Sequence, residues 1–271
     1  MINLFKNLTG KNSKSMRLQL FLFAVIAFFA ATKTANADIC PEFGPQKRVA
    51  SSFHSTAIID SANTVRYWGD GVNQTGSGAN VPFPLTLTGY TGTPVALAAS
   101  SVGASGTHQH FLLTTTNLYG WAYSANTIVN GTAGNTALTT IALPAGVTAA
   151  TASFIEASNG GLALVTTAGE VWIKAGTGSL CSPDVYGDGS TALDVAWHHV
   201  TTAPGVFLTG VTRLSFGGTA VMAMTLSGQV YIWGTRTYLG DVSNGKYQKQ
   251  SYSYTFSLCS TRSNSGRCKC N

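Results

Sequence analysis

Charged side chains are scarce in this sequence. Asp, Glu, Lys and Arg make up 10% of its 271 residues, whereas globular proteins average about 25%. Helix bundles and coiled coils need these residues, together with Leu, on periodic faces, so the composition excludes them. The chain instead has 30 glycines and is 44% hydrophobic. A disordered chain would be poor in aromatic and β-branched residues, and we therefore expect a β-rich, turn-rich globular protein.

Acidic residues are absent from both ends of the chain. Residues 1–37 and residues 246–271 each carry five Lys or Arg and no Asp or Glu. The region between them, residues 38–245, carries six bases and ten acids, which gives a net charge of −4. A duplex-binding surface needs clustered Lys and Arg to displace counterions from phosphates. The sequence therefore predicts no nucleic-acid partner for this region, although the whole chain has a formal charge of +6.

No apolar run in the sequence is long enough to cross a bilayer. The run Leu18–Ala31 has fourteen residues, and a spanning helix needs about 20. It follows the basic stretch Lys6–Arg17 and precedes Ala35-Asn36-Ala37, a small-x-small site of the kind that signal peptidase accepts. We interpret residues 1–37 as a signal peptide cleaved before Asp38, with an uncleaved anchor as the alternative. The mature protein is then secreted, periplasmic or at the cell surface, with no membrane insertion after cleavage.

The five cysteines do not form a recognisable framework. They are odd in number and irregularly spaced: Cys40, Cys181, Cys259, Cys268 and Cys270. An exported chain could form disulfides, and their state stays open. The single residue between the last two cysteines is too short for the usual gap of a zinc knuckle, so we expect no metal there.

One hairpin pattern occurs four times along the chain. Each copy has an apolar strand, a short polar turn and a second strand that carries aromatic residues, and the copies lie at residues 53–69, 110–121, 161–174 and 220–234. The residues that open the second strands are spaced 53, 53 and 59 positions apart: Val65, Leu118, Val171 and Val230. Such regularity indicates an internal repeat.

A single hairpin of this kind is only marginally stable in water, which explains the repetition. Equivalent sheets stacked face to face would bury the small residues of one against the aromatics of the next. Apolar stretches between the copies, such as Val95–Ala99, Val147–Ile155 and Val211–Phe216, suit further strands. The residues predicted to form the repeat core are Val65, Trp68, Leu118, Trp121, Val171, Trp172, Val230 and Trp233.

Two copies resemble a known repeat. The segment Gly228–Gly234 with Leu239-Gly240-Asp241, and the segment Val49–Ser55 before the first hairpin, are similar to the regulator of chromosome condensation (alpha-tubulin suppressor-like) family. The similarity spans residues 46–245, and the third copy departs from it with Lys174 where the family has Trp. The resemblance implies an all-β, β-propeller-like array of about four blades, each a four-stranded sheet.

Seven blades are usual in that family, so the resemblance also implies an incomplete array, apparently truncated and of a secreted bacterial type. The repeat stops after Gly245, and residues 246–271 are predicted to be an unstructured cationic tail outside the propeller. Four stacked sheets would leave an unburied face at each end, a hazard that closure normally removes. We therefore expect marginal stability, self-association through the open terminal blades, or a partner that covers them.

The histidines and one acidic segment are the candidates for chemistry. His54 and His108 fall where the family often has a structural histidine. His108 and His110 would share one strand face and could chelate a metal, but no carboxylate lies near them in sequence. His198-His199 would point to opposite faces. Asp184–Gly189 vaguely resembles a calcium loop, yet has a tyrosine where an oxygen ligand is needed, and is interpreted as a turn. We expect no metal and no cofactor.

The sequence contains no catalytic motif, and we predict that the protein is not an enzyme. The preferred function is a secreted scaffold that binds an unknown protein through blade loops. Family members act through such loops on a nuclear GTPase and chromatin or, in a bacterial secreted case, on a β-lactamase; no contact residue can be carried over. The alternatives are a glycan-binding or hydrolytic surface protein that uses Tyr90, Trp197 or Tyr238, and a truncated non-functional fragment of a larger surface protein.

The exported protein is predicted to begin at Asp38, because the basic, apolar and Ala-x-Ala segments follow one another in the order of a signal peptide. Intact-mass analysis of protein recovered outside the cytoplasmic membrane measures this. A recovered chain that still contains Leu18–Ala31 would contradict it.

Overall fold

The computed structural model describes residues 47–100, 107–124, 128–129, 134, 136–158, 161–176, 181–235 and 250–252. The interpreted signal peptide, its cleavage site, four of the cysteines and most of the tail lie outside these residues. Within the described part, strands dominate and the helical structure is one short 3-10 helix, η2 (Pro183–Tyr186). None of the described helices has the length and apolar character that a membrane span requires.

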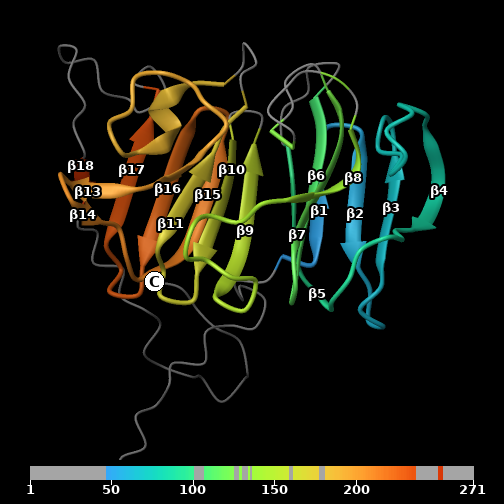
Figure 1. Ribbon diagram of the computed structural model, residues 1–271, viewed down its shortest axis with the longest axis horizontal. Coiled ribbons are helices and arrows are strands. Elements are labelled where there is room, and N and C mark those ends of the chain that lie inside the picture. Colours follow the sequence, from blue (N-terminus) through green and yellow to red (C-terminus); the bar gives the residue numbers. More distant parts are fainter. Residues whose placement is uncertain are drawn as a thin grey trace, which may run out of the picture. The chain divides into compact units, whose positions relative to one another are not determined.

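Four antiparallel sheets, each of four strands, follow one another along the chain (Figure 1). Sheet 1 consists of β1 (Val49–Ser51), β2 (Ser55–Ile59), β3 (Val65–Gly69) and β4 (Val81–Thr86). Sheet 2 consists of β5 (Pro94–Ala99), β6 (Thr107–Thr114), β7 (Leu118–Ser124) and β8 (Thr136–Ile141). Each strand is hydrogen-bonded to the next in sequence, so each sheet is a simple meander.

Sheets 3 and 4 repeat the same plan. Sheet 3 consists of β9 (Ala152–Ser158), β10 (Gly161–Thr166), β11 (Val171–Lys174) and β12 (Trp197–His199). Sheet 4 consists of β15 (Val211–Gly217), β16 (Ala220–Thr225), β17 (Val230–Gly234) and β18 (Gln250–Tyr252). A small separate hairpin, β13 (Thr201–Ala203) with β14 (Val206–Phe207), lies between them in sequence.

The predicted hairpins are the two central strands of each sheet: β2–β3, β6–β7, β10–β11 and β16–β17. The apolar stretches between the copies overlap the first strands β5, β9 and β15. The predicted all-β, propeller-like array of four blades is therefore confirmed.

The boundary predicted at residue 245 is wrong for one segment. Strand β18 lies within the region expected to be an unstructured tail, and it pairs with β17 in the register Ile232↔Gln250, Tyr231↔Ser251 and Val230↔Tyr252. The outer edge of β17 presents unpaired backbone N–H and C=O groups, which any adjacent extended segment can satisfy. That requirement is independent of side-chain pattern, so hydrophobic periodicity did not reveal it.

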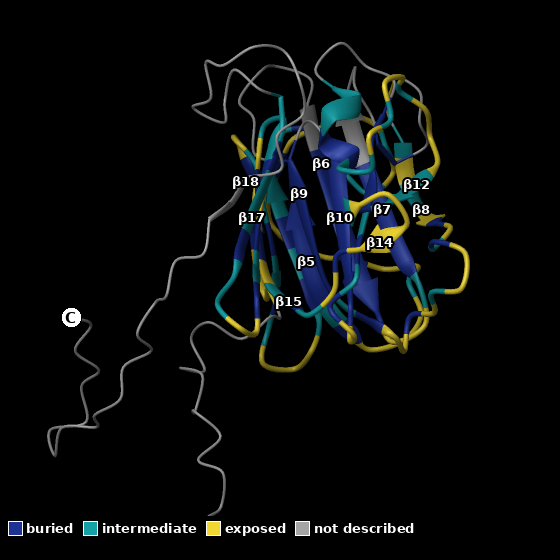
Figure 2. Cartoon of the chain, turned by 90° about the vertical axis from the view of Figure 1, so that its left-hand side faces the viewer, coloured by how far each residue is buried: buried dark blue, intermediate teal, exposed yellow. Residues whose placement is uncertain are grey.

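Sheet 2 shows why the repeats need one another, because both of its faces are buried. Along β6, Leu112 packs into a core shared with sheet 1, whereas Phe111 packs into a second core shared with sheets 3 and 4. Along β7, Trp121 joins the first core and Leu118 the second. All four side chains are 0% exposed. Figure 2 shows the resulting concentration of buried residues on β5, β6, β9 and β10.

The first strands of the sheets form the contacts between blades. Strand β1 packs against β5, β5 against β9, and β9 against β15. Small side chains allow this approach: Ala96 and Ala98 on β5 and Ala157 on β9 are at most 2% exposed. Each large apolar side chain buried in these joints contributes about 1.5–3 kcal/mol, so stacking supplies much of the stability that a lone hairpin lacks.

Polar contacts fix the joint between sheets 1 and 2. The Ser55 hydroxyl lies 2.8 Å from Nε2 of His110 across the joint, and both residues are buried. The His110 ring stacks on Trp121 with ring centroids 5.3 Å apart. The indole N–H of Trp121 donates to the carbonyl of Val72, in the loop that follows β3, at 3.0 Å. These contacts specify the relative position of the two sheets, which apolar packing alone leaves adjustable.

Gly69, which ends β3, cannot be replaced without strain. Its φ is +117°, and a Cβ there would meet the carbonyl oxygen of His54 and lie 2.5 Å from Cα of Ser55. We expect Gly69→Ala to lower the free energy of unfolding by about 2–4 kcal/mol, measured by denaturant titration. Gly89→Ala is the matched control, because φ is +87° but the nearest atom to its Cβ would be 3.8 Å away, and only the conformational cost of about 1–2 kcal/mol applies. Equal losses in the two variants would contradict the close approach.

Candidate functional site

A long segment with short elements of its own follows β11. We call residues 181–210 the sheet-3 insertion; it contains η2, the edge strand β12 and the hairpin β13–β14. Helix η2 starts with Pro183 in its first turn, where no N–H is needed, and the Ser182 hydroxyl accepts from the N–H of Asp184 at 3.3 Å. Gly187 ends it at φ +66°. Local sequence therefore determines this turn, and loops positioned on a rigid sheet are where binding residues concentrate.

His198 on β12 is held between two carboxylates. Its Nδ1 lies 2.7 Å from Asp188 and its Nε2 lies 2.9 Å from Asp194. The buried ring of Tyr186 stacks on the imidazole at 3.6 Å, and its hydroxyl donates to the carbonyl of Asp194 at 2.8 Å. Each ring nitrogen of His198 thus contacts a carboxylate, and these contacts tie the loop that follows η2 to the sheet.

The contacts of His198 differ from those of a catalytic triad. The Ser190 hydroxyl lies 3.3 Å from Nδ1 of His198, the same nitrogen that contacts Asp188. In a nucleophile–histidine–carboxylate triad the nitrogen that faces the hydroxyl acts as the base, and the orienting carboxylate contacts the other nitrogen. Asp194 does contact the other nitrogen, but Asp188 contacts the nitrogen that faces Ser190 at the shorter distance of 2.7 Å. The two carboxylates lie on opposite sides of the ring. Among the described residues, no group of three or more His, Cys, Asp or Glu side chains is placed to hold a metal ion.

Both aspartates titrate abnormally because of this network. Burial opposes ionisation of Asp188, but hydrogen bonds from the N–H of Ser190 and from His198 outweigh it, and the pKa of Asp188 lies below its usual value. The hydrogen bond from His198 is the main reason that the pKa of Asp194 is also lowered. A carboxyl with a lowered pKa stabilises the fold above its ordinary pKa, and this stabilisation is lost as the pH falls through the lowered value.

Lys174 holds the loop of the insertion that contains Val195. Its side chain is 9% exposed, and Nζ donates to the carbonyl of Val195. Burial lowers the pKa of Lys174, partly opposed by the charge of Asp194. Lys174 stands where the other three hairpins have Trp68, Trp121 and Trp233, and its side chain reaches the loop of its own blade.

Three rings from three strands stack in one column. Trp172 on β11 stacks on His199 on β12 at 4.1 Å, and His199 stacks on Phe207 on β14 at 3.8 Å with nearly parallel planes. Burial lowers the pKa of His199, which is opposed by the charge of Glu170, so the middle ring is neutral at physiological pH. The column ends at the surface, since Phe207 is 49% exposed.

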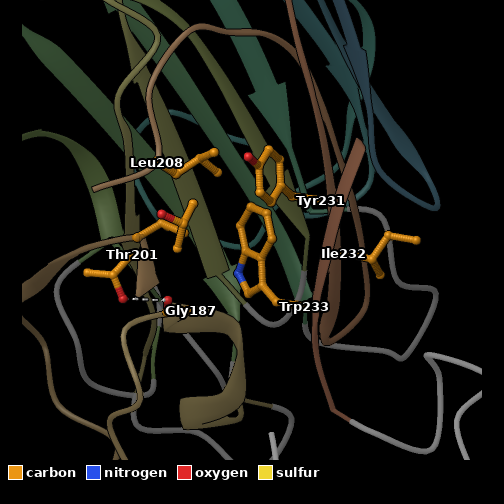
Figure 3. Close-up of a pocket in the computed structure, with 8 residues that line it drawn as sticks. Gly187, Thr201, Leu208, Tyr231, Ile232 and Trp233 are labelled. Carbon is orange, nitrogen blue, oxygen red and sulfur yellow. Dashed lines mark hydrogen bonds between the residues drawn. The ribbon is translucent and has the colours of Figure 1, made fainter. Parts of the chain in front are cut away.

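Other apolar side chains of the insertion are also exposed. Val206 is 53% exposed and Val195 is 48% exposed, and Figure 2 shows β14 among the exposed segments. Beside them is a cavity of about 20 Å³ lined by residues that include Thr201, Leu208 and Trp233 (Figure 3). This volume suits a single water. The insertion therefore exposes apolar side chains, and this cavity is too small for a ligand much larger than water.

The predicted repeat core divides into buried and half-buried members. The residues that open the second strands are at most 7% exposed: Val65, Leu118, Val171 and Val230. Trp121 and Trp233 are buried, and the indole of Trp233 donates to the carbonyl of Val185 at 2.7 Å. Trp68 and Trp172 are half-buried. The sequence did not predict that the indoles of Trp121 and Trp233 donate to carbonyls in loops of the neighbouring blades.

The described candidate histidines belong to different parts of the fold. His54 is exposed, with Nδ1 3.7 Å from the carboxylate of Asp70, and His110 is buried in the joint described above. His108 lies on β6 opposite Tyr123; its side chain is outside the described residues. His198 and His199 point to opposite faces of β12, as predicted.

The interpretation of residues 184–189 as a turn is confirmed by η2 and its glycine cap. Of the aromatics considered for glycan binding, Tyr90 is half-buried and packs edge-to-face with Tyr119 at 6.5 Å. Trp197 is half-buried and donates to the carbonyl of Ala142 at 2.7 Å. Tyr238 lies outside the described residues. The exposed ring, Phe207, was missed because a two-residue strand leaves no periodic signal.

Comparison with solved structures supports the propeller architecture. The chain is similar to the crystal structure of human WBSCR16, with a TM-score of 0.53 and 19% identity over 70% of this chain and 48% of that chain. It also matches a chain in the crystal structure of Kap60 bound to yeast RCC1 (Prp20), with a TM-score of 0.46, 17% identity and coverage of 69% and 43%. A third match is Prp20p from Saccharomyces cerevisiae, with a TM-score of 0.39, 15% identity and coverage of 69% and 57%.

No family model and no curated protein matches the sequence. The chain spans about half the length of the solved structures it matches. The first of them is an RCC1-like β-propeller, and the likeness shows that this chain has the same fold.

Acid should loosen the sheet-3 insertion. Because the pKa values of Asp188 and Asp194 are lowered, we expect the thermal midpoint to fall as the pH drops below about 4. His198→Phe keeps a ring on Tyr186 but removes both donors, so its midpoint should depend less on pH in this window. Thermal unfolding followed by circular dichroism at several pH values measures both curves. If the thermal midpoints of wild type and variant fell equally as the pH dropped, the role of the network would be contradicted.

Proposed function

We propose that the protein is a secreted, non-enzymatic scaffold that binds another protein through the sheet-3 insertion. The observation that carries the proposal is the exposed ring of Phe207 at the end of the column formed with Trp172 and His199. Buried aromatic anchors dominate the energetics of protein interfaces. An anchor that is already fixed in the unbound protein loses little side-chain entropy when it binds.

The surroundings of Phe207 favour a protein partner over a small ligand. Val195 and Val206 add exposed apolar area, and the adjacent cavity has room for about one water. His198 and Lys174 hold the loop that carries Val195, so the surface is preorganised. The proposed location outside the cytoplasmic membrane rests on the signal-like segment at residues 1–37, and the absence of an available catalytic base at His198 supports a non-enzymatic role.

Affinity capture with matched variants tests the proposal. Wild-type protein, Phe207→Ser and Leu226→Ser are used as baits against the envelope and secreted fractions of the source cells. Leu226 is 76% exposed and lies in the turn between β16 and β17, so it is an exposed apolar control outside the insertion. We expect one protein to be retained by wild type and Leu226→Ser, and to bind Phe207→Ser at least about thirtyfold more weakly, the loss of a hot spot of about 2 kcal/mol.

Equal retention by all three baits would contradict the proposed surface. Recovery of glycans instead of a protein, with the same dependence on Phe207, would favour the glycan-binding alternative and overturn the proposal. Thermal unfolding of each bait is the control for folding, because Ser at position 207 leaves one face of His199 uncovered.

A further inference from the structure

We call the two faces of a sheet the preceding face, on the side of the sheet before it in sequence, and the following face, on the side of the sheet after it. On β7, Trp121 lies in the core shared with sheet 1 and Leu118 in the core shared with sheet 3. The same alternation holds at the corresponding positions of the other sheets. It places Ile58 on the preceding face of sheet 1 and Ile232 on the following face of sheet 4, where the described residues provide no neighbouring sheet.

The first of these end faces has two apolar side chains beside an arginine that is paired with Asp60. Val49 on β1, Ile58 on β2 and Arg66 on β3 form one row of cross-strand neighbours. Val49 is 60% exposed, whereas Leu97, at the corresponding preceding-face position of β5, is 0% exposed.

The second end face is also more exposed than the corresponding face of sheet 2. Ser215, Met222 and Ile232 form a row across β15, β16 and β17. Met222 is 48% exposed, whereas the corresponding residue of sheet 2, Phe111 on β6, is 0% exposed. Figure 3 shows Ile232 on the side of β17 opposite to Tyr231, which points toward the third sheet and its insertion.

We propose that two copies of the chain associate head to tail, with sheet 4 of each copy stacked on sheet 1 of the other. The proposal continues a joint that the chain already makes three times, at β1–β5, β5–β9 and β9–β15, always between a following face and a preceding face. Two copies would close a ring of eight blades, and propellers have four to eight.

Interface area favours closure over an open chain of molecules. A face of four strands about five residues long covers on the order of 300 Å², given strands about 4.8 Å apart with a rise of about 3.3 Å per residue. One joint buries two such faces, about 600 Å², which is below the size of a stable interface. Two joints formed together bury about 1,200 Å², which reaches it. The closed dimer is therefore the stable assembly, because the second joint forms within the same complex.

Sedimentation velocity and light scattering of the full chain test the proposal, with a reducing agent present so that cysteines cannot cross-link it. We expect a mass twice that of the monomer. Val49→Asp and Met222→Asp each place a charge on one end face, and both side chains are exposed in the monomer, so the variants should fold. Leu226→Asp is the control and should remain a dimer.

The two single variants distinguish the geometry. In a head-to-tail dimer every joint contains one face of each kind, so either substitution alone should give monomers. If like faces paired, one of the two variants would still dimerise, and the proposal would be wrong. A monomeric wild type, a mass that grows without limit with concentration, or association that survives both substitutions would also overturn it. Circular dichroism confirms that each monomeric variant retains its β-sheet content.

Discussion

The structure depends on one constraint: each sheet has apolar residues on both faces and needs a neighbouring sheet on each side. Sheet 2 meets it fully, with Leu112 and Trp121 packed toward sheet 1 and Phe111 and Leu118 toward the sheets that follow. Repetition of one hairpin is the simplest way to satisfy this requirement, because every added blade covers the last and creates a new face to cover. The same logic leaves Val49 and Met222 exposed at the two ends of the array.

The hairpins could be predicted from the sequence because their signals are local. Val65, Leu118, Val171 and Val230 open second strands at regular spacing, and the aromatic residues that follow them are typical of buried β-structure. The outer strands could not be predicted in the same way. Strands such as β4 and β18 are selected by the backbone hydrogen bonds of their neighbours, and their side chains carry little pattern.

The candidate site was harder to predict than the fold. His198 was considered as a ligand, but its contacts with Asp188 and Asp194 come from a loop whose path the sequence does not reveal. Phe207 gains its significance only from the column of rings beneath it. The insertion combines a rigid, hydrogen-bonded base with an exposed apolar surface, which is how a repeat scaffold can present a binding surface without altering its blades.

Hydrogen exchange followed by mass spectrometry at low and high protein concentration tests the central claim that every face needs a neighbouring sheet. The account predicts that amides of β1–β3 and β15–β17 exchange more slowly at high concentration, because association covers both end faces, while those of β6 and β10 are protected equally at both concentrations. Protection of the end sheets that equals that of the middle sheets and does not change with concentration would contradict it.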